Sequence, residues 1–268
     1  MTDHVLQAAV CQFAATTDIA ENTASCVDLI ERAARAGAEL AVLPEAAMFF
    51  DPGRTVPGTH GQPTDGPFVQ NIAAAAAKAG IAVVVGMSES IDDPDRDSNT
   101  VVALSATGDL LGAYRKIHLY DAFGFKESDN VRPADIDRPL VFEVGGVRVG
   151  VATCYDLRFP EMFRWLVDAG ADLIALPAAW AVGPAKEHHW STLITARAIE
   201  NTVYLAASGQ TGPTSCGQSV VVDPMGTVVA GAGERPGLAV APVSVERIAQ
   251  VRGTNPSLAN RRFTVVPR

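Results

Sequence analysis

Short apolar runs alternate with longer amphipathic stretches along almost the whole of this chain, and hairpin signals interrupt the alternation. The β-branched apolar runs are typical of strands, and the periodic stretches are typical of helices. Turn residues at Thr107–Asp109, Gly145–Gly146 and Asp223–Gly226 separate paired apolar runs and predict antiparallel hairpins. Strands alternating with helices favour parallel pairing, whereas hairpins require antiparallel pairing. The pattern therefore predicts an α/β fold with mixed sheets.

The expected elements follow from this pattern. The strands are His4–Gln12, Leu40–Leu43, Ile81–Gly86, Thr100–Leu104, Leu110–Arg115, Leu140–Phe142, Arg148–Ala152, Leu173–Leu176, Val203–Ala207, Ser219–Val222 and Thr227–Ala230. The helices are Ile19–Arg35, Phe68–Ala79, one that starts at Pro160 and one from about Glu187 to Glu200.

Composition narrows the class of protein. A chain of 268 residues with 48% hydrophobic and 19% charged residues is expected to form one domain over 1–268 with a sizeable core. The net charge of −9 disfavours nucleic acid and anionic membrane surfaces as partners. The stretch Met1–Gln7 does not resemble a secretory signal, and no apolar run reaches membrane-spanning length. We expect a cytoplasmic enzyme.

The four cysteines are widely spaced, which does not suggest a disulfide framework. Cys11, Cys26 and Cys216 are interpreted as structural thiols. Cys154 differs because an apolar run ends there and a polar stretch follows, with Pro160 at the expected first position of a helix. Peptide N–H groups at such a turn can lower a thiol pKa and stabilise an oxyanion. This position predicts a nucleophile.

Two other strand ends carry ionisable side chains. Glu45 follows the run Leu40–Leu43, and Lys116 follows Leu110–Arg115. Chemistry in open α/β sheets gathers at the carboxyl ends of strands, so Glu45, Lys116 and Cys154 are expected to meet. A carboxylate can take the thiol proton, and an ammonium can stabilise the attacked oxygen. Together these residues predict acyl transfer.

The segments Leu43–Glu45, Tyr114–Leu119 and Cys154–Glu161 resemble the catalytic blocks of the nitrilase, or carbon–nitrogen hydrolase, superfamily. They are most similar to its branch of omega-amidases and deaminated glutathione amidases. The resemblance continues in order through His189–Trp190, Ala196–Asn201, Gln210–Gly212, Gly217–Ser219, Asp223–Gly226 and Arg261–Arg262. It implies a four-layer α-β-β-α sandwich, a homodimer or higher homo-oligomer, and no metal or organic cofactor.

The resemblance also implies roles for the site residues. Glu45 is the base, Lys116 stabilises charge, Cys154 forms a thioester, and Glu127 helps to position Lys116 and the substrate. The backbone N–H of Tyr155 is expected in the oxyanion hole. The spacing from Lys116 to Glu127 is shorter than in typical omega-amidases, so the pocket shape is expected to differ locally.

Arg158 matches a position that holds a substrate carboxylate in related carbamoyl hydrolases. A structural ion pair with Glu161 or Glu200 is an almost equal alternative for it. Arg197, Glu200 and Asn201 are expected to brace the catalytic loops. The expected substrate is a small terminal amide on a carboxylate-bearing molecule.

Several alternatives stay open. A nitrilase or an N-carbamoyl hydrolase would use the same triad, and a non-catalytic binding protein would lack part of it. His118 and Asp121 suggest a Cys-His-Asp triad, but the family pattern favours Glu45 as the base. The adjacent residues His188 and His189 would point about 100° apart on a helix and could not readily share a metal ion.

Two loops have open interpretations as well. Asp92–Asp97 lacks the glycine and terminal glutamate of a calcium loop, so a solvated turn is expected. The loop 52–67 is expected near the mouth of the site, either as a lid or as a plain connection.

Overall fold

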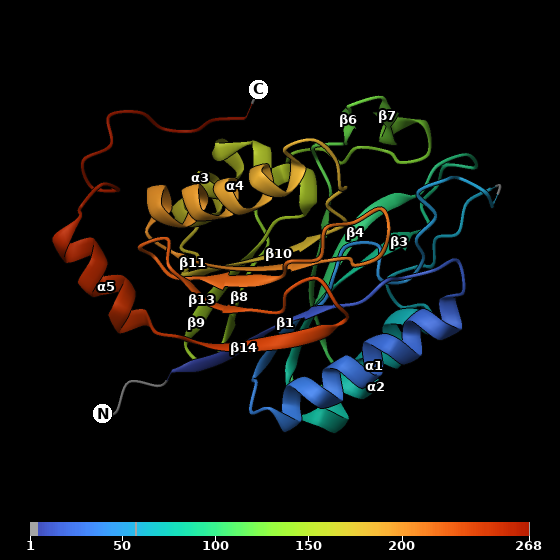
Figure 1. Ribbon diagram of the computed structural model, residues 1–268, viewed down its shortest axis with the longest axis horizontal. Coiled ribbons are helices and arrows are strands. Elements are labelled where there is room, and N and C mark those ends of the chain that lie inside the picture. The colour runs from blue at the N-terminus through green and yellow to red at the C-terminus, as the bar shows by residue number, and fades with distance from the viewer. Residues whose placement is uncertain (1–4, 57, 268) are drawn as a thin grey trace.

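The computed structural model describes residues 5–56 and 58–267. Two mixed six-stranded sheets form its centre (Figure 1). The first has the order β14-β1-β2-β3-β4-β5, and the second has the order β13-β12-β11-β10-β9-β8. The strands of the first sheet are β1 (Leu6–Gln12), β2 (Leu40–Val42), β3 (Ala82–Glu89), β4 (Ser98–Leu104), β5 (Leu110–Arg115) and β14 (Gly237–Val243). Those of the second are β8 (Val141–Val144), β9 (Val147–Val151), β10 (Leu173–Ala178), β11 (Tyr204–Gly209), β12 (Val220–Val222) and β13 (Val228–Gly231).

Helices cover the outer face of each sheet. Helices α1 (Ile19–Arg35) and α2 (Pro67–Ala79) pack on the first sheet, whereas α3 (Pro160–Asp168) and α4 (Lys186–Asn201) pack on the second (Figure 1). The resulting order of layers is the expected α-β-β-α sandwich. Helix α5 (Val245–Thr254) lies at one edge, beyond β14. Among the described residues, no helix combines the length and the apolar character needed to span a membrane.

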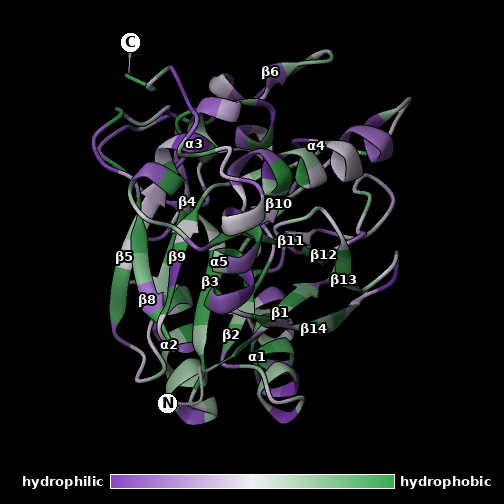
Figure 2. Cartoon of the chain, turned by 90° about the vertical axis from the view of Figure 1, so that its left-hand side faces the viewer, coloured by the Kyte–Doolittle hydropathy of each residue, from purple (hydrophilic) through white to green (hydrophobic). Residues whose placement is uncertain are grey.

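The central strands are buried on both faces, which explains why their sequences are apolar runs. In β1, Ala8 and Val10 pack toward the second sheet, while Ala9 and Cys11 pack toward α1 and α2. Successive side chains of a strand point to opposite faces, so an uninterrupted apolar run serves two cores. Figure 2 shows hydrophobic strands in the interior and hydrophilic residues on the outward sides of the helices.

Helix α1 shows how local sequence fixes an element. The Asp18 carboxylate accepts hydrogen bonds from the backbone N–H groups of Ala20 and Glu21 and so caps the helix. The residues that face the sheet are apolar and recur at helical spacing, and they include Cys26, Leu29, Ile30 and Ala33.

Most expected elements are confirmed. The three predicted hairpins form as β4–β5, β8–β9 and β12–β13, all antiparallel. Strand β3 continues to Glu89, beyond the expected end at Gly86. The first strand is described from Leu6, and His4 lies outside the described residues. Helix α3 begins at Pro160 as expected, and the polar stretch before it, which contains Cys154, forms a 3₁₀ turn, η2 (Cys154–Arg158), that was not predicted.

Candidate active site

The three predicted catalytic residues converge where the two sheets meet. Glu45 follows β2 and Lys116 follows β5 in the first sheet, whereas Cys154 follows β9 in the second. All three are buried, with exposed fractions of 4% for Glu45, 1% for Lys116 and 8% for Cys154. They line one cavity of about 770 Å³. The carboxyl ends of strands from both sheets therefore build a single site.

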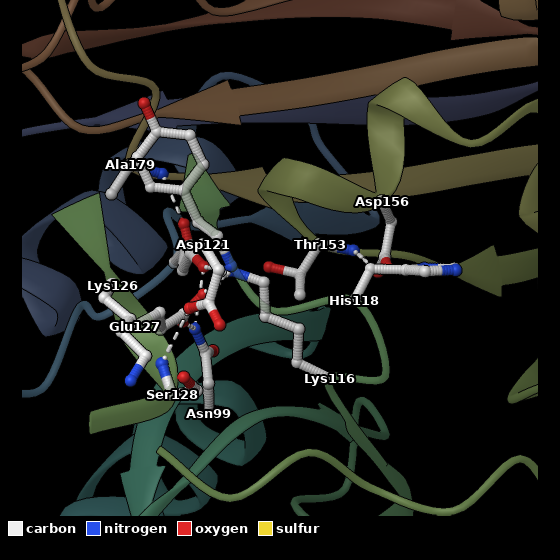
Figure 3. Close-up of polar contacts among 12 residues, drawn as sticks. Asn99, Lys116, His118, Asp121, Lys126, Glu127, Ser128, Thr153, Asp156 and Ala179 are labelled. Carbon is white, nitrogen blue, oxygen red and sulfur yellow. Dashed lines mark hydrogen bonds and ion pairs between the residues drawn. The ribbon is translucent and has the colours of Figure 1, made fainter. Parts of the chain in front are cut away.

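Lys116 lies between two carboxylates. Its Nζ donates to Glu45 Oε1 at 2.9 Å and to Glu127 at 3.0 and 3.1 Å. The Asn99 amide donates to the same two carboxylates at 2.8 and 2.9 Å. Figure 3 shows the Lys116 side chain extending toward Glu127 and Asn99. Glu127, which begins the 3₁₀ turn η1 (Glu127–Asp129), thus contacts Lys116, as the family resemblance implied.

Backbone contacts fix Glu45 from both sheets. Its Oε2 accepts a hydrogen bond of 2.7 Å from the N–H of Ala179, directly after β10. Its carbonyl oxygen accepts from the Gln210 side chain at 2.9 Å. Gly86 in β3 lies so close that a Cβ there would stand 2.5 Å from the Cα of Glu45. The glycine permits this close approach and keeps the carboxylate in place.

The Cys154 backbone is in the left-handed region, with a φ of 42°. A residue without glycine's freedom adopts this conformation at a cost, as is common for residues held at functional sites. The turn directs the thiol into the cavity shared with Glu45 and Lys116.

The charges of the site are interdependent. Burial alone would raise the pKa of Glu45, but the charge of Lys116 and hydrogen bonds from Lys116, Cys154 and Asn99 lower it. Burial and the charge of Glu45 raise the pKa of Cys154 well above the ordinary thiol value, and Lys116 offsets only part of this. Burial opposes the charge of Lys116, yet Glu127 and Glu45 raise its pKa. The resting site therefore holds a carboxylate, an ammonium and a neutral thiol.

A buried carboxylate anchors the turn that carries Cys154. Asp156 accepts hydrogen bonds from Tyr114 Oη and His118 Nδ1, both at 2.7 Å, and from the backbone N–H of Thr153 at 2.9 Å. His118 is thus engaged with Asp156 (Figure 3) and also stacks on Phe159. Asp121 accepts from the N–H of Ser128. The alternative Cys-His-Asp triad is therefore not assembled.

Helix α4 braces the same turn. The Arg197 guanidinium donates to the carbonyl oxygen of Leu157 through Nε at 3.1 Å and Nη2 at 2.9 Å. Glu200 pairs with Arg197 at 3.0 Å, and Asn201 donates to the Arg197 carbonyl at 2.9 Å. These residues support the turn that carries Cys154 without lining the cavity, as the sequence suggested.

Arg158 lies against the cavity rather than in an ion pair. Its guanidinium stands 4.7 Å from the ring of Trp180 and 5.3 Å from that of Phe123. Glu200 is paired with Arg197, and no described residue forms an ion pair with Arg158, so the structural alternative with Glu161 or Glu200 was wrong. The ring of Tyr155 also lines the cavity.

Lys186 is a cavity residue that the sequence did not reveal. It is the first residue of α4, and its Nζ donates to Tyr120 Oη at 2.6 Å. Burial and the positive charge of Arg158 lower its pKa. A lysine at the start of a helix is usually solvated, so nothing in the local sequence distinguished it.

The loop 52–67 contributes Pro52, Arg54 and Thr59 to the cavity wall, which confirms its expected place. Whether it gates the site stays a prediction.

The other cysteines are free and buried away from this chemistry. Burial raises the pKa of Cys11 and of Cys216 to about 12. Over residues 5–56 and 58–267, no three or more His, Cys, Asp or Glu side chains are grouped so that they could hold a metal ion.

Comparisons with known proteins agree with this geometry. The carbon-nitrogen hydrolase family model matches residues 7–253. The chain is 41% identical to deaminated glutathione amidase of Escherichia coli O157:H7, covering 94% of this chain and 95% of that protein. It is 36% identical to the mouse (Mus musculus) deaminated glutathione amidase, covering 95% of this chain and 82% of the relative.

Solved structures share the fold. The C. elegans NitFhit protein superposes with a TM-score of 0.88 at 29% identity, covering 99% of this chain and 68% of that chain. A variant of the amidase from Nesterenkonia sp. AN1, with the acetamide moiety of fluoroacetamide added covalently at its active-site cysteine, gives a TM-score of 0.81 at 28% identity, covering 97% and 94% of the two chains. This chain belongs to the carbon-nitrogen hydrolase family.

Proposed function

We propose that this protein is a cysteine-dependent amidase that hydrolyses a small amide through a thioester. The observation that carries the proposal is the contact of Lys116 with Glu45 at 2.9 Å, beside the buried thiol of Cys154. A base, a nucleophile and a positive charge then surround one cavity, which is what acyl transfer to a thiol requires.

The reaction proceeds by proton transfers through Glu45. Its carboxylate takes the Cys154 proton, and the thiolate attacks the amide carbon. Lys116 and the backbone N–H of Tyr155 stabilise the tetrahedral oxyanion. When this intermediate collapses, the Glu45 acid gives its proton to the departing amine, and the thioester remains. Glu45 then takes a proton from water, the hydroxide attacks the thioester, and the acid product leaves as Cys154 regains its proton.

The surroundings of the triad favour this sequence of steps. Glu127 also holds the Lys116 ammonium, at 3.0 and 3.1 Å, so the ammonium keeps its position while Glu45 changes its protonation state. Burial strengthens the interaction of Lys116 with a developing oxyanion, because the effective dielectric constant is lower than in water. The acetamide adduct on the cysteine of the Nesterenkonia amidase supports a covalent route on the same fold.

We infer that the substrate carries a carboxylate besides its amide. The relatives named deaminated glutathione amidase support this class, and so does Arg158, which faces the cavity without an ion pair among the described residues. Candidate substrates are the omega-amide of a 2-oxo acid, such as 2-oxoglutaramate, and deaminated glutathione.

The experiment is an amide panel read by release of ammonia or amine, combined with intact-protein mass spectrometry. An acyl adduct should accumulate on a slowly deacylated substrate, and Cys154→Ala should abolish both the adduct and turnover. Cys216→Ala is the matched control and should retain both. Activity of Cys154→Ala would refute the proposal. Release of carbon dioxide together with ammonia would instead identify an N-carbamoyl hydrolase, and turnover confined to nitriles a nitrilase.

We further propose that the enzyme is a single domain that acts as a homo-oligomer in the cytoplasm. The family model spans most of the chain, and all four cysteines are free, as a reducing compartment would keep them. Phe263 and Val266 are 89% and 75% exposed, and contact with a second subunit would remove these two apolar side chains from water. Light scattering during gel filtration measures the mass, and a monomer at micromolar concentration would contradict the oligomer.

A further inference from the structure

Three side chains on one wall of the cavity form what we call the donor cluster: Tyr120, Arg158 and Lys186. They come from three separate segments, namely the stretch before the hairpin of β6 (Asp121–Ala122) and β7 (Phe125–Lys126), the end of η2, and the start of α4. Lys186 Nζ lies 2.6 Å from Tyr120 Oη and 3.5 Å from the centre of the Phe123 ring.

The cluster offers hydrogen-bond donors and lacks an acceptor that is free to bind a donor. An ammonium has only donors, so Tyr120 Oη accepts from Lys186 and its own proton must point elsewhere. A guanidinium likewise only donates, and the Nε of Arg158 is buried without a partner. The group that complements such a set is an anion with several acceptor atoms, such as a carboxylate.

The positive charge of the cluster is not neutralised by the protein. The other two cationic side chains at the cavity are paired: Lys116 with Glu45 and Glu127, and Arg54 with Asp129. Within the described part of the chain, Arg158 and Lys186 form no ion pair and are instead placed against the aromatic rings of Trp180 and Phe123. Two unpaired cations side by side repel each other, and a bound anion relieves that repulsion.

The cluster is also close to the reacting thiol. A charge on Cys154 acts on the pKa values of both Lys186 and Tyr120, and the ring of Tyr120 meets that of Tyr155, the residue next to Cys154, edge to face at 5.2 Å between ring centres. A molecule bound at both places therefore needs only a short chain between its anionic group and its amide.

We propose that Lys186 and Tyr120 complete, with Arg158, a subsite for the carboxylate of the substrate, and that Lys186 determines the preference for anionic over neutral amides. This inference rests on the proposed amidase function and names the part of the site that selects its substrate class. In this role Lys186 supplies charge and a hydrogen bond, and it also orients the Tyr120 hydroxyl so that its proton points to the ligand.

The test compares two amides of similar length, the monoamide of glutaric acid and the neutral valeramide. Lys186→Met should raise KM for the anionic amide at least tenfold and leave KM for valeramide within twofold. Lys186→Arg keeps the charge and should recover most of the loss, while Tyr120→Phe should show a smaller loss confined to the anionic amide. Lys78→Met is the control for net charge, because Lys78 is an exposed lysine paired with Glu31 on the far helices. It should change neither KM.

Equal increases in KM for both amides after Lys186→Met, or no change for either, would overturn the subsite. Calorimetric binding of glutarate separates this inference from the amidase proposal, because it needs no turnover. If no amide is hydrolysed but Lys186→Met still weakens glutarate binding at least tenfold, the subsite stands and the proposed reaction falls. If amides are hydrolysed and glutarate binds both proteins equally, the reaction stands and the subsite falls.

Discussion

At the scale of single residues, the site keeps its proton on sulfur and its negative charge on Glu45. The pKa of Cys154 is raised and the pKa of Glu45 is lowered, so both shifts favour this distribution of charge. In the proposed mechanism, the thiolate is therefore generated only when Glu45 takes the proton. This arrangement protects a buried thiol from general alkylation and oxidation, because the thiolate is the reactive form.

We expect the protonation of Glu45 to determine the acid limb of the pH profile. Since its pKa is lowered, it remains a carboxylate at pH 5, and kcat/KM for a neutral amide should decline only below the ordinary glutamate value of about 4.3. Initial rates with valeramide from pH 7 down to 3 measure the limb, and circular dichroism at each pH checks that the protein stays folded. An acid limb centred above pH 5 in folded protein would contradict this.

Lys116 is expected to be as important for stability as for catalysis. Lys116→Met leaves Glu45 and Glu127 without their positive partner, and Glu45 is almost fully buried, so we expect a loss of about 3–5 kcal/mol in the free energy of unfolding at pH 7. The deficit should shrink as the pH falls, because protonation removes the unpaired charges. Urea titrations at two pH values measure it.

Lys78→Met is the stability control for this variant. Its ion pair with Glu31 is exposed to solvent, and such pairs contribute little to stability. Unchanged stability of Lys116→Met at both pH values would show that the carboxylates are solvated or repaired by other groups.

At the scale of elements, the turn η2 is held by Asp156. Tyr114 on β5 reaches this carboxylate, so the strand that precedes Lys116 is tied to the turn that carries Cys154. We expect Tyr114→Phe to lower the free energy of unfolding by about 1.5–3 kcal/mol, the range for a hydrogen bond to a charged group. We also expect a larger effect on kcat than on KM, because the position of the Cys154 thiol relative to Lys116 would be less well fixed.

Steady-state kinetics and urea unfolding test the Tyr114→Phe prediction. Tyr204→Phe is a suitable comparison, since Tyr204 is buried at the start of β11, at the end of the strand remote from the site. It should leave kcat unchanged. A Tyr114→Phe enzyme with normal kcat and reduced stability would show that Asp156 supports the fold without positioning Cys154.

The elements that the sequence predicted are those with a strong periodic signal. Helix α1 and strand β5 have the bounds that were expected, Ile19–Arg35 and Leu110–Arg115. Strand β14 was not predicted. It contains Pro242, which counts against a strand but is tolerated at the edge of a sheet, where β14 lies. Helix α5 was missed because it buries only Ile248 and Val251 and therefore has a weak apolar stripe.

The sequence likewise predicted some residues of the candidate site and not others. Glu45, Lys116 and Cys154 could be found because strand ends are visible in the sequence and the topology brings them together. Lys186 could not, since its proposed role depends on Tyr120 and Arg158, which come from distant segments. The supports of the turn, such as Asp156, also become apparent only from contacts across the two sheets.

At the scale of the whole molecule, the proposed catalytic residues stand on both sides of the seam between the sheets. Gln210, directly after β11, spans that seam: its Oε1 accepts from the N–H of Ala15 at 2.8 Å, and its Nε2 donates to the Glu45 carbonyl at 2.9 Å. Gln210→Met keeps the volume but leaves two buried backbone groups unpaired, so we expect a loss of about 2–4 kcal/mol.

Because the backbone of Glu45 is one of the partners of the Gln210 side chain, kcat of Gln210→Met should fall together with the free energy of unfolding. Gln250→Met, on the exposed face of α5, removes a comparable amide and should change neither. Rates and urea curves for both variants provide the measurement. Full activity of Gln210→Met would show that the packing of the two sheets holds Glu45 in position without the hydrogen bond from Gln210.

The path of the chain through the sheets has one further consequence. The first half supplies β1 to β5 and the second half supplies β8 to β13, but β14 returns to pair with β1 along its whole length, from Leu6 opposite Val243 to Gln12 opposite Gly237. Between the halves, residues 135–138 are exposed and outside any strand or helix. A protease that cuts there would not release two independent pieces. The two fragments would stay associated because β14 of the second half is paired with β1 of the first half. We therefore expect the cleaved enzyme to remain one complex and to keep its activity. Two halves that are produced separately should regain activity only when β14 pairs with β1.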